Sequence, residues 1–329
     1  MRHRRLPLAD YVDGVCAGDR ARLAQAITLI ESRHPADLDL AAALLDAVLP
    51  RTGESIRVGI TGVPGVGKST FIDALGLYLV REAGRRVAVL TVDPSSERSG
   101  GSLLGDKTRM ARLTGEAGAF IRPTAAGGFL GGVAPRTREA LLLCEAAGYD
   151  TILIETVGVG QSETLVRSMA DSLLLLLLAG AGDSLQGMKR GIMEMADLFA
   201  ITKADGDTRA AADRARGEYA AALRLFAPSG DGWAPPVLTC SALTGEGVSE
   251  VWRQLLAHDT LGRESGDRLR RRQGQNVAWL RQLVALELDR RFREDPAVGA
   301  RLPRFEDDVT AGRTTPIAAA RALFAALAG

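Results

Sequence analysis

The residues from Gly62 to Thr70 constrain the fold of this chain more than any other stretch. They fit the phosphate-loop pattern, in which two glycines separated by four residues are followed by Lys and Ser. Glycines let the backbone curl so that successive N–H groups point inward, and the following helix adds the positive end of its dipole to this anion site. Lys68 brings a mobile cation to the outer phosphates, and the Ser69 hydroxyl is placed to bind Mg²⁺. The residues predicted to hold the nucleotide here are Gly62, Val63, Pro64, Gly65, Val66, Gly67, Lys68, Ser69 and Thr70.

The flanks of this loop are those that a phosphate loop requires. Residues 56–60 read as a buried strand, and residues 70–79 have helical apolar spacing. Further along the chain, buried strands alternate with helices, which predicts an α/β fold with a mainly parallel central sheet covered by helices on both faces. In such a sheet the loops that follow the strands gather on one rim, where a ligand binds. The predicted strands are 56–60, 86–92, 151–155, 172–179, 197–202 and 236–240.

Acidic residues follow two of these strands and are candidates for a Mg²⁺ site. Asp93 ends the second strand, Asp106 lies in the Gly-rich stretch after it, and Glu155 ends the strand over 151–155. Carboxylates at these positions can face a phosphate-bound Mg²⁺, and the N–H of Gly158 can meet the terminal phosphate. For Asp93 an equally good interpretation is that it caps the turn before Pro94, and Asp106 can cap a helix.

The stretch from Thr202 to Asp205 reads Thr-Lys-x-Asp and resembles the guanine-specificity signature Asn-Lys-x-Asp. Asp205 can accept both the ring N–H and the exocyclic amine of guanine, which adenine does not offer in that arrangement, and Lys203 would lie over the base. Thr202 in place of Asn is expected to weaken a side-chain tie to the phosphate loop. Ser241, Ala242 and Leu243 resemble the Ser-Ala loop that supports the base, so the two stretches together predict guanine.

Composition narrows the partners and the compartment. The 41 basic and 40 acidic residues leave a net charge of +1, which favours neither nucleic acid nor an acidic membrane as a partner. Cys16, Cys144 and Cys240 are far apart and predict a reducing compartment and buried small side chains. The longest apolar run, 173–179, is far shorter than the roughly 20 residues that cross a bilayer, and the start of the chain does not resemble a secretory signal, so we expect a cytoplasmic protein.

The two ends of the chain differ from its centre, so the sequence predicts three parts. Residues 1–53 form a helical N-terminal extension, 54–260 a nucleotide-binding core, and 261–329 a helical C-terminal arm. The arginine-rich stretch 263–272 could meet nucleic acid, but a solvated helix face or a set of interface ion pairs is the preferred interpretation. A helix to about Arg293 and a shorter one over 316–327 carry apolar sides that need a partner, which predicts an arm for self-association. The apolar residues of the first helix are Val277, Leu280, Leu283, Val284, Leu286 and Leu288.

Together these motifs resemble the MeaB/ArgK GTPases, bacterial relatives of the mitochondrial methylmalonic aciduria type A protein. The resemblance spans the whole nucleotide core and fits the helical extensions at both ends. The matching stretches are Gly62 to Thr70, Val92 to Ser96, Gly100 to Met110, Ile154 to Glu163 and Ala181 to Glu194.

The resemblance implies a homodimeric chaperone of an adenosylcobalamin-dependent acyl-CoA mutase, usually methylmalonyl-CoA mutase. Such proteins use GTP binding and hydrolysis, with Mg²⁺, to gate delivery of the cofactor and to protect the mutase. Carried over by position, Lys68, Ser69 and Thr70 bind phosphate and Mg²⁺, while Lys203 and Asp205 read guanine. The residues that the resemblance assigns to the acidic metal shell are Asp93, Asp106 and Glu155, and those assigned to an additional switch are Asp183, Gln186 and Lys189.

The catalytic candidates are Lys68, Glu155, Gln161 and Lys189. Gln161 lies three residues after Gly158, where Ras-like enzymes place a Gln directly, so we expect slow basal hydrolysis that the mutase accelerates by ordering the loops. Lys189 or Arg109 could supply an additional cation.

Two other classes of function stay open at this point. A nickel-inserting GTPase would need a soft or imidazole-rich cargo site, whereas this chain has only His3, His34 and His258 and no paired cysteines. A kinase or ATPase linked to amino-acid transport would prefer ATP to GTP, which is the reverse of the preference predicted from Asp205.

Overall fold

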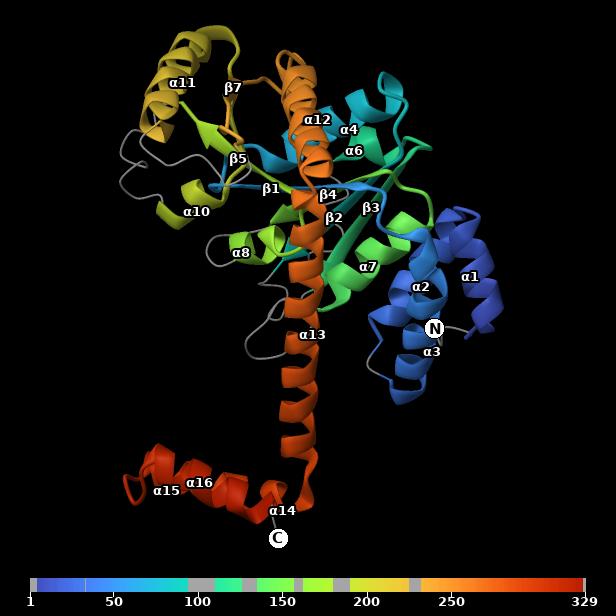
Figure 1. Ribbon diagram of the computed structural model, residues 1–329, viewed down its shortest axis with the longest axis vertical. Helices are drawn as coiled ribbons and strands as arrows, with labels where there is room; N and C mark the ends of the chain where they lie inside the picture. Colours follow the sequence, from blue (N-terminus) through green and yellow to red (C-terminus); the bar gives the residue numbers. More distant parts are fainter. Residues whose placement is uncertain are drawn as a thin grey trace. The chain divides into compact units, whose positions relative to one another are not determined.

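Apolar runs in the sequence form the strands of one parallel sheet (Figure 1). The computed structural model describes residues 5–32, 34–93, 110–125, 135–156, 162–179, 190–224 and 232–327. Within these residues the sheet has seven strands in the order β3-β2-β4-β1-β5-β6-β7, and neighbouring strands are all parallel. The strands are β1 (Ile56–Gly62), β2 (Val87–Asp93), β3 (Ala119–Ala125), β4 (Thr151–Thr156), β5 (Ser172–Leu178), β6 (Leu198–Thr202) and β7 (Val237–Thr239).

The α/β fold predicted from the sequence is confirmed, and each of the six predicted strands is present within a residue or two of its predicted bounds. The sequence analysis missed β3, which carries Arg122 and Pro123 and therefore does not read as an apolar run. Proline removes a ladder donor and is tolerated mainly on edge strands. Accordingly, β3 lies at the edge of the sheet and pairs with β2 alone.

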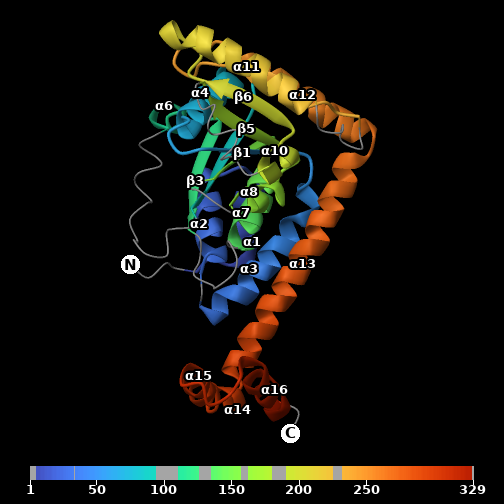
Figure 2. The same cartoon turned by 90° about the vertical axis from the view of Figure 1, so that its left-hand side faces the viewer.

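Helices cover both faces of the sheet (Figures 1 and 2). The described helices are α1 (Leu8–Cys16), α2 (Arg20–Ile30), α3 (Pro35–Val48), α4 (Lys68–Arg81), α6 (Ala111–Thr114), α7 (Pro135–Ala146), α8 (Ser162–Arg167), α10 (Arg190–Met195), α11 (Arg209–Leu223), α12 (Val248–Glu264), α13 (Asp267–Glu294), α14 (Pro296–Gly299), α15 (Leu302–Thr310) and α16 (Pro316–Leu327), with 3₁₀ turns η1 (Leu49–Arg51) and η3 (Gly206–Thr208). None of these helices is both long and apolar enough to cross a bilayer.

Alternating strand residues build apolar cores on both faces of the sheet, and a further cluster packs β5 and β6 against α11. On β4, Ile152 and Ile154 point toward the core that α7 and the N-terminal helices complete. Leu153 points the other way, into the core formed with α4 and α12. Because β1 is flanked by β4 and β5 at the centre of the sheet, its C-terminal end is held from both sides. That end carries the phosphate loop.

The N-terminal extension predicted from the sequence is helical and packs on the sheet through α7. The Asp19 side chain caps α2 by accepting the N–H groups of Ala21 and Arg22 at 2.8 and 3.2 Å, and Pro35 begins α3. Leu23 and Ile27 of α2 are fully buried in the same core as Leu143 of α7. In Figure 1 these blue helices lie beside α7.

Contacts divide the chain into two compact units, Met1–Arg272 and Gln273–Gly329. In the second unit α14, α15 and α16 pack against one another, and the ring of Phe292 at the end of α13 lies 5.1 Å from that of Phe324 on α16. Val298, Ala319 and Leu323 are the buried residues of this unit among those described. The division at residues 53 and 260 predicted from the sequence remains a prediction, because grouping by contacts does not test it.

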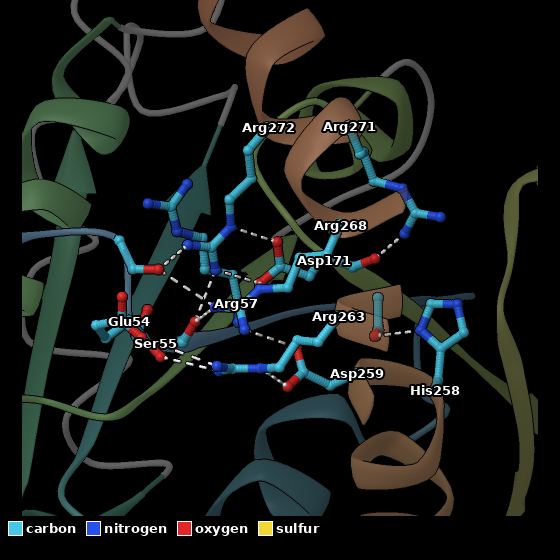
Figure 3. A network of polar contacts seen from close by, with 12 residues as sticks. Glu54, Ser55, Arg57, Asp171, His258, Asp259, Arg263, Arg268, Arg271 and Arg272 are labelled. Carbon is cyan, nitrogen blue, oxygen red and sulfur yellow. Dashed lines mark hydrogen bonds and ion pairs between the residues drawn. The ribbon is translucent and has the colours of Figure 1, made fainter. Parts of the chain in front are cut away.

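Two residues of the arginine stretch 263–272 differ from the interpretation preferred above, whereas Arg263 and Arg270 are largely exposed and form ion pairs. Arg268 and Arg272 are 8% and 9% exposed, so neither lies on a solvated helix face. Both bind carboxylates of the same chain, principally Asp171 and Asp259 (Figure 3). The sequence did not indicate this because Asp171 lies about 100 residues away and is an isolated acid in front of an apolar strand.

Candidate functional site

The phosphate loop connects the end of β1 to the start of α4, as its pattern predicts. Gly65 and Gly67 have φ values of +77° and +94°, a region that L side chains rarely adopt. Gly62 faces a second constraint, because a Cβ at this position would lie 2.5 Å from the carbonyl oxygen of Leu176 on β5. Val66 is fully buried and fixes the middle of the loop, whereas Pro64 is exposed. The loop is therefore a glycine-dependent backbone structure fixed on the sheet.

Lys68 is the first residue of α4 and folds back over the loop. Its Nζ donates to the carbonyl oxygens of Gly62 at 2.8 Å and of Val63 at 3.4 Å. Burial lowers the pKa of Lys68, and the negative charges of Glu155 and Glu163 partly oppose that shift. The ammonium group is thus held over the concave side of the loop, where the predicted role requires a cation.

Ser69 and Glu155 meet where β1, β4 and α4 come together. The Ser69 hydroxyl donates to Oε1 of Glu155 at 2.8 Å, and Glu155 is 3% exposed. Glu155 lies opposite Ile60 in the β1–β4 ladder, one strand away from the phosphate loop. A hydroxyl and a carboxylate are hard oxygen donors of the kind that Mg²⁺ prefers, so this pair fits a Mg²⁺ ion. Thr70, the next residue of α4, is exposed.

Asp93 is the last residue of β2, two positions beyond the residue paired with Glu155. Its backbone therefore lies on the same edge of the sheet as the Ser69 and Glu155 pair, while its side chain is outside the described part of the structure. Among the described residues there is no group of three or more His, Cys, Asp or Glu side chains that could hold a metal ion.

Thr202 ends β6 and connects the predicted base-reading stretch to the phosphate loop. Its hydroxyl lies 2.7 Å from the carbonyl oxygen of Val66 and 3.2 Å from that of Leu177. The shorter side chain thus reaches the loop backbone, while the expectation that Thr makes a weaker tie than Asn stays a prediction. Thr202 is 4% exposed, so the contact is shielded from water.

Lys203 makes a second connection between the same two stretches. Its Nζ donates to the carbonyl oxygen of Gly65 at 2.9 Å. Lys203 is also the only described residue other than glycine with a positive φ, +56°. A non-glycine residue in this conformation costs free energy and is found where surrounding contacts impose it, often at functional sites.

Asp205 follows β6 and faces Ser241, which lies in the loop that follows β7. The Ser241 hydroxyl donates to Oδ2 of Asp205, and its oxygen accepts the N–H groups of Leu243 and Thr244 at 3.2 Å each. Ser241 is fully buried, Ala242 is partly buried, and Leu243 is 83% exposed. Ser241 thus orients the carboxylate that is predicted to read guanine.

The sequence analysis missed Gly247, which closes this loop at the start of α12. Its φ is +77°, and a Cβ would lie 2.3 Å from the carbonyl oxygen of Thr239. The carbonyl of Glu246 accepts the N–H of Ser241 at 2.8 Å. The signal in the sequence was the Gly-x-Gly spacing of Gly245 and Gly247 just before a helical pattern.

The structure thus brings the phosphate loop, Glu155, the stretch from Thr202 to Asp205, and Ser241 to one edge of the sheet. The other predicted site residues lie outside the described part of the chain. They are Asp106, Gly158, Gln161 and Lys189, as well as Arg109, Asp183 and Gln186.

Known proteins similar to this chain match it along most of its length. The model of one protein family, described as methylmalonyl-CoA mutase-associated GTPase MeaB, matches residues 23–297. The chain is 51% identical to GTPase ArgK of Escherichia coli over 281 residues, which cover 85% of each protein. It is 46% identical over 323 residues to the mitochondrial methylmalonic aciduria type A homolog of Mus musculus, covering 95% of this chain and 78% of the mouse protein.

A solved structure has a similar fold over its full length. The crystal structure described as LAO/AO transport system kinase superposes with a TM-score of 0.77 and 39% sequence identity. The alignment covers 99% of this chain and 100% of that protein.

Proposed function

This chain belongs to the MeaB family and is a GTPase, and from that premise we propose that it is a GTP-controlled chaperone of a cobalamin-dependent acyl-CoA mutase. The partner we propose is methylmalonyl-CoA mutase, which is the enzyme named in the description of the matching family. In this role, GTP binding and hydrolysis would gate the delivery of adenosylcobalamin and protect the mutase from inactivation.

One observation carries the nucleotide part of the proposal. The Thr202 hydroxyl bonds the carbonyl of Val66, and Lys203 Nζ bonds the carbonyl of Gly65. Two stretches about 135 residues apart in the sequence, one typical of phosphate binding and one typical of guanine binding, are therefore joined by direct hydrogen bonds. This arrangement supports a single site that spans a guanine nucleotide from base to terminal phosphate.

The proposed mechanism assigns each residue a physical task. The N–H groups of the phosphate loop and the ammonium group of Lys68 bind the phosphates and offset the negative charge that spreads over the γ-phosphate oxygens in the transition state. Asp205, oriented by Ser241, accepts the two guanine N–H donors. Glu155, held by the Ser69 hydroxyl, helps to orient the attacking water.

We further propose that Ser69 and Glu155 hold a Mg²⁺ ion, together with Asp93 and Asp106. The hard oxygen donors of the first two residues lie 2.8 Å apart at the edge of the phosphate loop, which supports this assignment. Bound Mg²⁺ would supply positive charge to the β- and γ-phosphate oxygens.

We also propose that the protein is a homodimer joined through the C-terminal helices. Val277, Leu280, Val284 and Leu288 of α13 are 48–62% exposed, and their spacing places them along one side of the helix. A second copy offers an identical apolar side, and symmetric dimers are the commonest way in which such a surface is buried.

A single-turnover measurement tests the chaperone proposal. GTP hydrolysis is followed with the protein alone, with methylmalonyl-CoA mutase, and with serum albumin at the same concentration as a control. We expect the mutase to accelerate hydrolysis, and a supplied cation in such systems contributes about 10³- to 10⁵-fold. Equal rates with mutase and with albumin would remove the chaperone proposal while leaving the GTPase assignment intact.

The similar structure described as a transport system kinase favours one alternative, in which the γ-phosphate goes to a protein acceptor. Incubation with γ-labelled GTP or ATP and a cell extract separates the two functions. Under our proposal the label appears as free phosphate and GTP is preferred; a labelled protein with a preference for ATP would support the kinase.

A further inference from the structure

Arginines near the start of α13 lie in a network of charged side chains at the start of β5, and two of them, Arg268 and Arg272, are buried (Figure 3). Arg268, Arg271 and Arg272 are spaced i, i+3 and i+4, so they lie on the same side of the helix. Arg272 Nε lies 2.7 Å from Oδ1 of Asp171, and its Nη2 lies 2.6 Å from Oδ2. Arg268 Nε lies 3.8 Å from Oδ2 of Asp171, and Arg271 donates to the Asp171 carbonyl oxygen.

The same arginines bind backbone carbonyls in front of β1. The Nη2 atoms of Arg268 and Arg272 each lie 2.6 Å from the carbonyl oxygen of Ser55, and both residues also donate to that of Gly53. Asp171 in turn accepts the N–H of Arg57 at 2.9 Å. The helix is therefore fixed to the starts of two neighbouring strands by directional, charge-assisted bonds.

A second buried carboxylate joins the network from α12. Asp259 Oδ2 lies 2.8 Å from Arg263 Nε, and Asp259 Oδ1 lies 3.3 Å from Arg268 Nη1. Asp171 and Asp259 are 3% and 6% exposed. The guanidinium groups thus lie between two buried carboxylates, and removing either acid would leave a buried positive charge without its partner.

From Gln273 onward, α13 contains no buried residue in the described structure. The buried residues of the helix are Arg268 and Arg272 near its start, and between Val277 and Leu288 its apolar side chains are largely exposed. Glu287 forms ion pairs with Arg290 and Arg291, but exposed pairs of this kind stabilise a helix only weakly. Starting a helix is the costly step, while adding residues to an existing turn is not.

We propose that Asp171 nucleates α13. By holding Arg268, Arg271 and Arg272 in place, it fixes the first turn in helical geometry, and the residues from Gln273 onward extend that turn. Asp171 is a positioning residue for self-association, a use that rests on the proposed homodimer. A helix formed in advance lowers the ordering cost that binding a second copy would otherwise carry.

Hydrogen exchange of the full-length protein, measured by mass spectrometry, tests this inference. In Asp171→Asn the side chain keeps its shape but loses the negative charge that binds Arg268 and Arg272. We expect amide exchange over residues 276–292 to accelerate by about tenfold or more, as in a segment whose local opening has become easier. GDP affinity should stay within twofold, because Asp171 does not contact the phosphate loop in the described structure.

Two further variants make the result specific. Asp73→Asn removes another buried carboxylate, which binds Arg112 and the N–H of Leu113 and makes no contact with α13 in the described structure, so its exchange over 276–292 should match the wild type. Arg272→Lys keeps the positive charge but loses the fork that bridges Asp171 and the Ser55 carbonyl, and should accelerate exchange as Asp171→Asn does. If Asp171→Asn does not fold, Arg272→Lys is interpreted in its place.

Unchanged exchange over 276–292 in a folded Asp171→Asn or Arg272→Lys variant would overturn the proposal. Sedimentation of the wild type over a concentration series is measured alongside. A wild type that stays monomeric removes the homodimer, whereas the exchange result still decides whether Asp171 nucleates the helix.

Discussion

Asp205 gives the sharpest test of base recognition at the scale of single residues. In Asp205→Asn the side chain no longer accepts two N–H groups, so we expect GTP affinity to fall by about 10- to 100-fold, the cost of leaving buried polar groups unpaired. Preference should move toward xanthine nucleotides, which present an acceptor where guanine presents a donor. Titrations with fluorescent, nonhydrolysable analogues of GTP and xanthosine triphosphate measure both effects, with Asp207→Asn, a nearby exposed acid, as the control. Unchanged GTP affinity would mean that the base is read elsewhere.

Thr202 tests the connection between base and phosphates. Thr202→Val preserves the shape of the side chain but removes the hydroxyl that bonds the Val66 carbonyl, so we expect a loss of about 1–2 kcal/mol in the free energy of unfolding. Urea unfolding measures this loss. Thr310→Val removes an exposed helical hydroxyl and serves as the control; equal effects of the two substitutions would contradict the role given to Thr202.

The cysteines provide a residue-scale test of the core. Burial raises the pKa of Cys240 to about 12, and burial also raises the pKa of the fully buried Cys144 thiol. Since the thiolate is the reactive form, iodoacetamide should modify the partly buried Cys16 first in the folded protein. Peptide mass spectrometry over a time course checks this order, and equal labelling of all three thiols would show that the core opens under the conditions used.

At this scale the sequence predicted well where chemistry depends on residue type. The positions of Lys68 and Ser69 at the start of a helix, and of Asp205 after a strand, could be predicted because each belongs to a motif with fixed spacing. The partner and length of the tie made by Thr202 could not be predicted, because they depend on how far β6 brings a short hydroxyl toward a backbone carbonyl.

At the scale of elements, Gly247 tests the loop that orients Asp205. In Gly247→Ala the new Cβ meets the Thr239 carbonyl oxygen at 2.3 Å, and the φ of +77° is strained for alanine. We expect a loss of about 1–3 kcal/mol in the free energy of unfolding and weaker GDP binding. Gly217→Ala, within α11 and with no atom within 4 Å, is the matched control and should stabilise by about 0.5–1 kcal/mol.

Elements differ in how far the sequence predicts them. Buried parallel strands such as β5 are continuous apolar runs and are recognised at once, whereas β3 is not, because Pro123 and Arg122 interrupt its pattern. The start of α13 carries arginines that look solvated in the sequence. Their burial depends on Asp171 and on the carbonyl oxygens of Gly53 and Ser55, which only the assembled sheet brings together.

At the scale of the whole molecule, the buried acids predict how stability depends on pH. Burial alone would raise the pKa of Asp171, but the hydrogen bond from Arg272 and the charges of Arg272, Arg57 and Arg268 outweigh it and hold the pKa below its usual value. The same balance, with Arg57 as the main partner, lowers the pKa of Glu145. Because these pKa values are lower in the folded state, their stabilisation is complete above about pH 4 to 4.5 and is lost as pH falls below that range.

Urea unfolding between pH 3 and pH 7 measures this dependence. The free energy of unfolding should fall steeply below about pH 4.5 in the wild type and less steeply in Asp171→Asn, which is already destabilised at pH 7. Identical slopes in the two proteins would contradict the ionised state assigned to Asp171.

The central position of β1 has one more consequence. Arg268 and Arg272 of α13 bind the carbonyl oxygen of Ser55, directly before β1, and the last residue of β1 begins the phosphate loop. One extended strand, roughly 20 Å long, therefore separates the two. Hydrogen bonds to β4 on one side and β5 on the other hold this strand in its extended form. A displacement of the start of α13 and the binding of a triphosphate would therefore act on opposite ends of the same strand.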